Sequence, residues 1–152
     1  MANSYFNRGK NEIFNGSIDL LTDTIKVMLV TSSYTFNADD DFLDNGGAND
    51  PTDHELSGTG YQAGFAGTGR KTLSNKAVNL DDANDRSEFD NTVDLTWTAI
   101  NAGTAAAAIV YKHLTSDAAS VMIAYIDTSG FPIVTNGGDL TLAFNAEGIL
   151  QF

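Results

Sequence analysis

Short apolar segments, each bounded by turn-forming residues, recur from residue 24 to the end of the chain. The clearest is Thr92 to Ile100, in which four apolar residues alternate with polar ones: Val93, Leu95, Trp97 and Ala99. A period of two is typical of a strand with one buried and one wet face. Clusters such as Asp81–Asp85, Ser129–Gly130 and Asn136–Gly138 supply the turns between segments. The pattern therefore predicts an all-β fold.

Further segments extend this prediction. Thr24–Thr31 is apolar on both faces, and Gly138–Asn145 alternates, with Leu140, Leu142 and Phe144 expected inward. Thr104–Tyr111 and Val121–Ile126 are too short for most helices and are expected to be central strands, although Ala105–Ala108 intrinsically favours helix. Weaker strands are expected at Lys71–Leu73, Ala77–Leu80, Arg86–Asp90, Ile133–Thr135 and Gly148–Phe152. About nine short strands indicate a single β-sandwich or jelly-roll-like domain over residues 1–152.

Two regions depart from the strand pattern. Within the N-terminal segment 1–16, Ser4–Phe14 has the apolar spacing of one short helix, which Asn15–Gly16 would end. Residues 36–69 form one long loop, first acidic and then glycine-rich. Because long loops in compact domains tend to be functional or mobile, we expect this loop to be an arm that reaches a neighbouring subunit.

The charge balance excludes several partners. Eight basic and twenty acidic side chains give a net charge of −12, and the basic residues are scattered along the chain. Binding to phosphates requires clustered Lys and Arg, so we expect neither nucleic acid nor an anionic membrane as a partner. No stretch approaches the roughly 20 apolar residues of a membrane span, and residues 1–10 lack a signal peptide's apolar run. With no cysteine in the chain, synthesis in a reducing cytoplasm is expected.

Templates for chemistry fail in this sequence. His54 and His113 stand in no nucleophile motif and are too few for a typical zinc site. The acidic run beginning at Asp39 departs from the calcium-loop pattern at Leu43, which leaves a solvated loop or an irregular calcium site. Ser57–Gly64 imitates a dinucleotide fingerprint without the strand and helix that would give it meaning. We assign no catalytic, cofactor-binding or metal residue and expect no enzymatic activity.

Aromatic side chains divide into two groups. Trp97, Phe89 and Phe144 fall on inward positions of expected strands and are predicted to be core residues. Others lie in or beside the long loop and the N-terminal segment, where they would either anchor a partner or fold back on their own domain. The predicted partner contacts are Tyr5, Phe6, Arg8, Tyr34, Phe36, Phe42, Tyr61 and Phe65.

Several segments in order along the chain carry a resemblance: Asn7–Lys10, Ile18–Leu20, Asp23–Val27, Ser33–Thr35, Leu56–Tyr61, Val110–Lys112, Ala124–Asp127 and Gly148–Leu150. Together they resemble a family of small virion structural proteins of tailed bacteriophages. The sequence departs from that family at Phe65–Gly69, which is extra loop, and at Ala105–Ala108.

The resemblance implies a capsid decoration or cement protein, a β-rich subunit, often trimeric, on the outside of the major-capsid shell. It further implies assembly in the host cytoplasm and a final location at the capsid surface. Two alternatives stay open. One is a tail, neck or host-binding component of the virion. The other is a carbohydrate-binding or hydrolytic β-sandwich, with an exposed aromatic platform or two essential carboxylates facing a groove.

Overall fold

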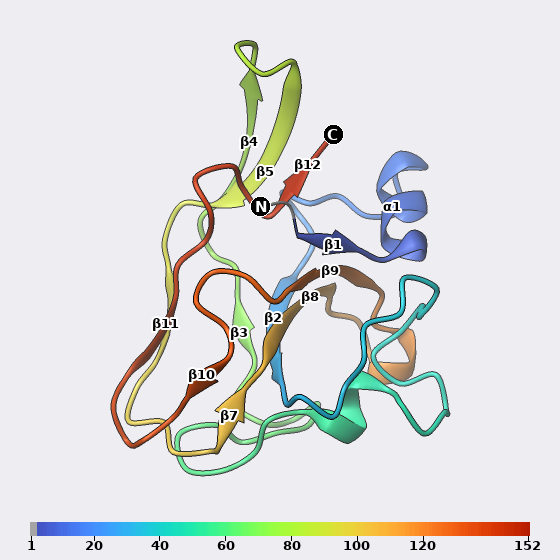
Figure 1. The fold of residues 1–152 in the computed structure, drawn as a ribbon. Helices are drawn as coiled ribbons and strands as arrows, with labels where there is room; N and C mark the ends of the chain where they lie inside the picture. Colours follow the sequence, from blue (N-terminus) through green and yellow to red (C-terminus); the bar gives the residue numbers. More distant parts are fainter. Residues whose placement is uncertain (1–2) are drawn as a thin grey trace.

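A five-stranded antiparallel sheet forms the centre of the computed structural model, which describes residues 3–152 (Figure 1). Its strand order is β1-β9-β8-β2-β3. The strands are β1 (Ser4–Tyr5), β2 (Ile25–Val30), β3 (Lys71–Thr72), β8 (Ala107–Lys112) and β9 (Met122–Ile126). The predicted all-β fold is confirmed.

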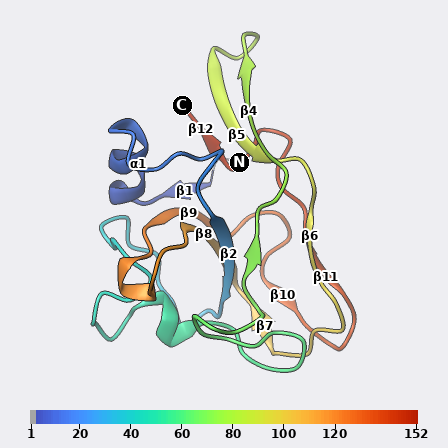
Figure 2. The ribbon, with the colours of Figure 1, turned by 180° about the vertical axis from the view of Figure 1, so that it is seen from behind.

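Smaller antiparallel sheets surround this centre. A three-stranded sheet has the order β12-β5-β4, and two pairs join β11 to β6 and β10 to β7. Their bounds are β4 (Lys76–Asp81), β5 (Arg86–Asn91), β6 (Leu95–Trp97), β7 (Thr104–Ala105), β10 (Ile133–Val134), β11 (Leu140–Leu142) and β12 (Leu150–Gln151). The β4–β5 hairpin projects away from the rest of the molecule in both ribbon views (Figures 1 and 2).

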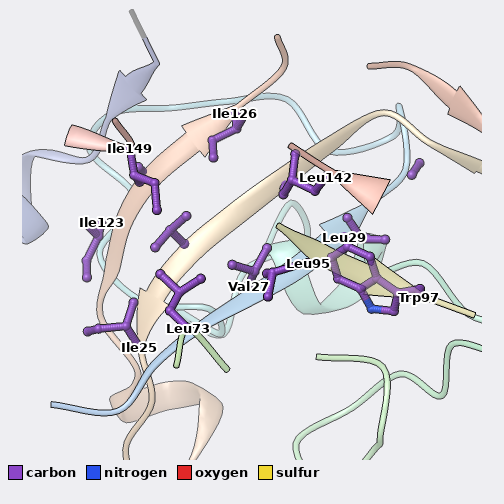
Figure 3. Packing of buried hydrophobic residues seen from close by; sticks show 14 of the residues in the cluster. Ile25, Val27, Leu29, Leu73, Leu95, Trp97, Ile123, Ile126, Leu142 and Ile149 are labelled. Atoms are coloured by element: carbon purple, nitrogen blue, oxygen red, sulfur yellow. The ribbon is translucent and has the colours of Figure 1, made fainter. Parts of the chain in front are cut away.

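Both faces of the central sheet are buried, because side chains on β2 and β8 alternate between two hydrophobic clusters. Val27, Leu29 and Val110 point into the larger cluster, and Met28 and Ile109 into the smaller one. Trp97 and Leu95 of β6 and Leu142 of β11 pack over β2 in the larger cluster (Figure 3). The smaller cluster is covered by Phe6, Tyr34 and Leu43. Covered strands of this kind read as continuous apolar runs, as the sequence of residues 104–111 indicated.

The alanine-rich run is therefore strand, against its intrinsic helix preference. Ala107 and Ala108 are completely buried on opposite faces of β8. The register between β8 and β9 shifts by one residue after Val110: Val110 pairs with Ala124, and Tyr111 pairs with Met122. Burial on both faces and hydrogen bonding to β2 and β9 override the local propensity.

Several local predictions need correction, among them the strand over Gly138–Asn145, which is limited to Leu140–Leu142. The helix α1 spans Asn7–Phe14, while Ser4–Tyr5 instead pairs with β9, because that strand offers an open edge. The strand predicted over Thr92–Ile100 is limited to Leu95–Trp97. Val93 is half exposed and Ala99 adopts a left-handed backbone (φ 49°), so neither takes the inward position that alternation predicted.

Candidate functional site

The long loop packs against its own domain instead of extending from it. Between β2 and β3 it contains one short 3-10 helix, η1 (Pro51–His54). Phe42 forms an isolated antiparallel β-bridge with Val121, and the Leu56 amide donates a hydrogen bond to the Leu29 carbonyl at 2.9 Å. Leu43 and Leu56 are completely buried. The expected arm is thus a fixed part of the fold, because its apolar side chains complete both hydrophobic clusters.

The predicted partner contacts differ in exposure. Phe6, Tyr34 and Tyr61 are buried, and Tyr5, Phe36 and Phe42 pack partly buried against the two clusters. The three buried side chains fold back on their own domain, the second of the two outcomes that the sequence left open, and they belong to the core. Phe65 is 40% exposed, with its ring stacked on His113 at 4.9 Å between centroids.

Arg8 links α1 to the acidic part of the loop. Its guanidinium lies 2.8 Å from the Glu12 carboxylate and 3.4 Å from that of Asp41, and stacks over the Phe42 ring at 4.4 Å. The contacts are partly exposed, so their contribution to stability is modest. Arg8 therefore has an internal role in this conformation.

The acidic residues of the loop cap its turns. Asp50 accepts hydrogen bonds from the Asn45 side chain at 3.1 Å and the Gly47 amide at 2.7 Å. Burial alone would raise the pKa of Asp50, but these hydrogen bonds outweigh it and lower the pKa below its usual value. Across residues 3–152, no three His, Asp or Glu side chains are grouped so as to hold a metal ion.

A buried ionic cluster fastens the second half of the loop. Arg70 donates to both carboxylate oxygens of Glu55, at 2.9 and 2.7 Å, and to those of Asp117 in the 3-10 helix η2 (Asp117–Ala119), at 2.5 and 3.1 Å. The side chains of Arg70 and Glu55 are each only 2% exposed. We call these three residues the Arg70 clasp.

Further hydrogen bonds surround the clasp, whereas the buried Tyr111 hydroxyl beside it has no hydrogen-bond partner among residues 3–152. The Tyr61 hydroxyl donates to Glu55 Oε1 at 3.1 Å and accepts from the Leu29 amide at 3.0 Å, while the Gly64 amide donates to Glu55 Oε2 at 2.9 Å. Burial would lower the pKa of Arg70, but its hydrogen bonds to Glu55 and Asp117 outweigh burial and raise it. Burial also raises the pKa of the neighbouring Tyr111 to about 12. The Arg70 guanidinium therefore stays charged within this buried structural joint.

Sequence reasoning missed the clasp, since its members lie at positions 55, 70 and 117 with no motif spacing. The only signal was a lone Arg following a glycine run. Glycines in this stretch are required because a larger side chain would clash with neighbouring backbone. A Cβ at Gly60 (φ 77°) would lie 2.8 Å from the Ala99 carbonyl oxygen. The stretch therefore packs backbone against backbone and shows no strand-to-helix transition of a nucleotide site.

Replacing Tyr61 by Phe tests how the loop is fastened. The substitution leaves the buried Leu29 amide without its acceptor, so we expect a loss of about 1–3 kcal/mol in the free energy of unfolding. Urea unfolding followed by fluorescence of Trp97, the single tryptophan, measures it. Tyr125→Phe is the matched control and should change stability by less than about 0.5 kcal/mol. Equal effects of the two substitutions would contradict this role of the Tyr61 hydroxyl.

Exposed apolar side chains occur at the end of α1, on β4 and directly after β12. The Phe14 ring packs on Phe152 at 5.3 Å between centroids. Phe152 exchanges two backbone hydrogen bonds with Ser87 of β5. On β4, Leu80 pairs with Ser87 and Val78 pairs with Phe89. We call Phe14, Val78, Leu80 and Phe152 the apolar patch; its members are 45–80% exposed.

Three members of the patch lie on regular elements, Phe14 on α1 and Val78 and Leu80 on β4, and Phe152 directly follows β12. Val78, Leu80 and Phe152 lie on one face of the β12-β5-β4 sheet, since cross-strand neighbours share a face. Exposed apolar side chains that gather on one surface are typical of protein–protein contact sites. In the surface formed by residues 3–152 there is no pocket, and α1 is too short to cross a membrane.

Comparison with known proteins gives no match to a protein-family model, a curated protein or a solved structure.

Proposed function

We propose that this protein is a structural component of a tailed-phage particle, a decoration or cement protein that binds the assembled major-capsid shell. The observation that carries the proposal is the apolar patch, which exposes two aromatic and two aliphatic side chains on α1, on β4 and directly after β12. Aromatic side chains in such positions are typical anchors of protein interfaces. The resemblance in sequence to phage virion proteins supplies the identity of the partner.

The Arg70 clasp supports the same proposal. A subunit that stabilises a shell needs a fixed shape, because ordering flexible segments on binding reduces affinity. Here the longest loop is already ordered by the clasp and by the burial of Leu43 and Leu56. Binding only to the assembled shell stabilises that shell by mass action, and many symmetric copies add avidity.

The contact residues proposed for the shell are accordingly Phe14 and Phe152, with Phe65 as the exposed member of the loop. Replacing both Phe14 and Phe152 by Ser should raise the dissociation constant for shells at least about tenfold, because the loss of two aromatic anchors costs more than about 1.4 kcal/mol. Val134→Ser removes an exposed apolar side chain from β10 instead and should leave occupancy unchanged.

The decisive experiment mixes the protein with capsids that lack it and measures both occupancy and the temperature at which the shell ruptures. Binding with a raised rupture temperature is the expected result. If the protein neither binds nor raises that temperature, the cement function is wrong. Binding to isolated tails instead of capsids would indicate the tail or neck alternative, and binding to a glycan array would favour the carbohydrate-binding one.

A further inference from the structure

Strand β4 leaves one edge of its sheet open. On β5, the backbone groups of Ser87 and Phe89 point to β12, since Ser87 exchanges two hydrogen bonds with Phe152 and the Phe89 carbonyl accepts from Ile149. In an antiparallel ladder, alternate residues point to opposite sides. On β4, Ala77 and Asn79 therefore pair with β5, and the backbone groups of Val78 and Leu80 point outward, with no backbone partner within residues 3–152.

This edge lacks the usual protection against pairing. Natural edge strands are short, charged, kinked by proline or covered. β4 has six residues, and the four between its terminal charges are uncharged: Ala77, Val78, Asn79 and Leu80. Leu80 is 80% exposed and lies beside the free backbone groups. An open, apolar edge of this length is suited to accept another strand.

The charges of β4 select the orientation of that strand. Lys76 lies at its beginning, with its ammonium donating to the Asp23 carbonyl of the same chain. Asp81, which pairs with Arg86, and the exposed Asp82 lie at its end beside the turn. A second β4 aligned in parallel would place like charges together, whereas an antiparallel one places Lys76 near the acidic end of the other strand. Opposite charges across a strand pair stabilise it, and like charges destabilise it.

We infer that β4 pairs antiparallel with β4 of a second copy of this chain, which joins two three-stranded sheets into one of six strands. Several antiparallel registers bring outward-facing residues together, and we choose the one with the twofold axis beside Asn79 because it places Lys76 opposite Asp82. Val78 then lies opposite Leu80 of the second copy, and Leu80 opposite its Val78. One pair further, Lys76 approaches Asp82 of the second copy. This contact joins two copies and does not by itself build a trimer.

The inference predicts a concentration-dependent dimer. Light scattering should give about twice the chain mass of 16.2 kDa. Val78→Lys places two additional charges near the twofold axis and should raise the dissociation constant at least about tenfold. Val134→Lys introduces the same charge at an exposed residue of β10 and should leave the dimer intact. Val78 is half exposed, and circular dichroism should confirm that both variants remain folded.

A second variant separates specific pairing from general repulsion. Asp82→Lys lowers the net negative charge of each copy, which should favour any non-specific association between chains of charge −12. In the proposed register it brings two cations together at each end of the paired strands, so we expect weaker dimerisation. Asp94→Lys, at another exposed aspartate, makes the same change in net charge and should weaken nothing.

The inference is overturned if the chain stays monomeric up to about 500 µM, because a contact with a Kd above that concentration is worth less than about 5 kcal/mol. A trimer whose mass Val78→Lys leaves unchanged would also overturn it, as would equal losses with Val78→Lys and Val134→Lys. The result is independent of shell binding: a dimer that ignores capsids refutes the proposed function alone, and a monomer that binds them refutes this inference alone.

Discussion

Replacing Arg70 by Met is expected to lower the free energy of unfolding by about 3–5 kcal/mol, the cost of leaving a buried ionic partner uncompensated. Glu55 is as buried as Arg70 and would keep only the Tyr61 hydroxyl and the Gly64 amide as partners. Because domains of this size are stabilised by only about 5–15 kcal/mol, the variant should unfold at markedly lower urea concentration. Fluorescence of Trp97 reports the transition, since its indole donates to the Gly69 carbonyl next to Arg70.

Arg8→Met is the matched control. Arg8 also faces two carboxylates, Glu12 at 2.8 Å and Asp41 at 3.4 Å, but its side chain is 38% exposed. Water and salt screen such pairs, so the expected loss is below about 1 kcal/mol. Equal losses in the free energy of unfolding for the two substitutions would show that burial does not determine the contribution of the Arg70 clasp to stability.

Substituting Gly9 by Ala should destabilise the protein, although the same change in a helix interior ordinarily stabilises by about 1 kcal/mol. Gly9 is the point where α1 touches β9. A Cβ there would lie 2.3 Å from the Met122 carbonyl oxygen and 2.8 Å from the Ile123 Cα, both backbone atoms that cannot move aside. The helix would have to lift from the sheet and uncover Phe6, so we expect a loss of at least about 2 kcal/mol.

The control lies two residues along the same helix. Asn11 is exposed, and Asn11→Ala should stabilise by about 0.5 kcal/mol through helix propensity alone. Chemical denaturation of both variants under identical conditions compares the signs directly. Stabilisation by both substitutions would show that α1 does not rest on β9 at Gly9.

Period-two alternation and apolar runs predicted most of the strands, because burial of one or both faces leaves a direct trace in sequence. The hairpin turn at Asp81–Asp85 and the end of α1 near Gly16 were predicted from turn chemistry, and Gly16 takes the expected left-handed backbone (φ 79°). Val93 and Ala99 followed the alternation but fall outside β6, because β6 has only three residues paired with β11. Alternation does not report where a partner strand ends.

The interaction surfaces were less predictable. The sequence around Tyr61 indicates a flexible loop, yet Tyr61 is buried. Its hydroxyl accepts a hydrogen bond from the Leu29 amide of β2, which has no partner strand at that position within residues 3–152. Conversely, Leu80 occupies an ordinary strand pattern and is exposed because β4 forms the outer edge of its sheet. Both outcomes depend on which strands become neighbours, and that information lies in contacts between residues distant along the chain.

The alternation of β8 between two hydrophobic clusters has a consequence for how the protein opens. Val110 and Ile109 belong to different clusters, and hydrogen bonds join the strand to β2 on one side and β9 on the other. Loosening either layer therefore removes support from the strand that the other layer also needs. Partial opening is then nearly as costly as global unfolding, which ties the halves of the molecule into one cooperative unit.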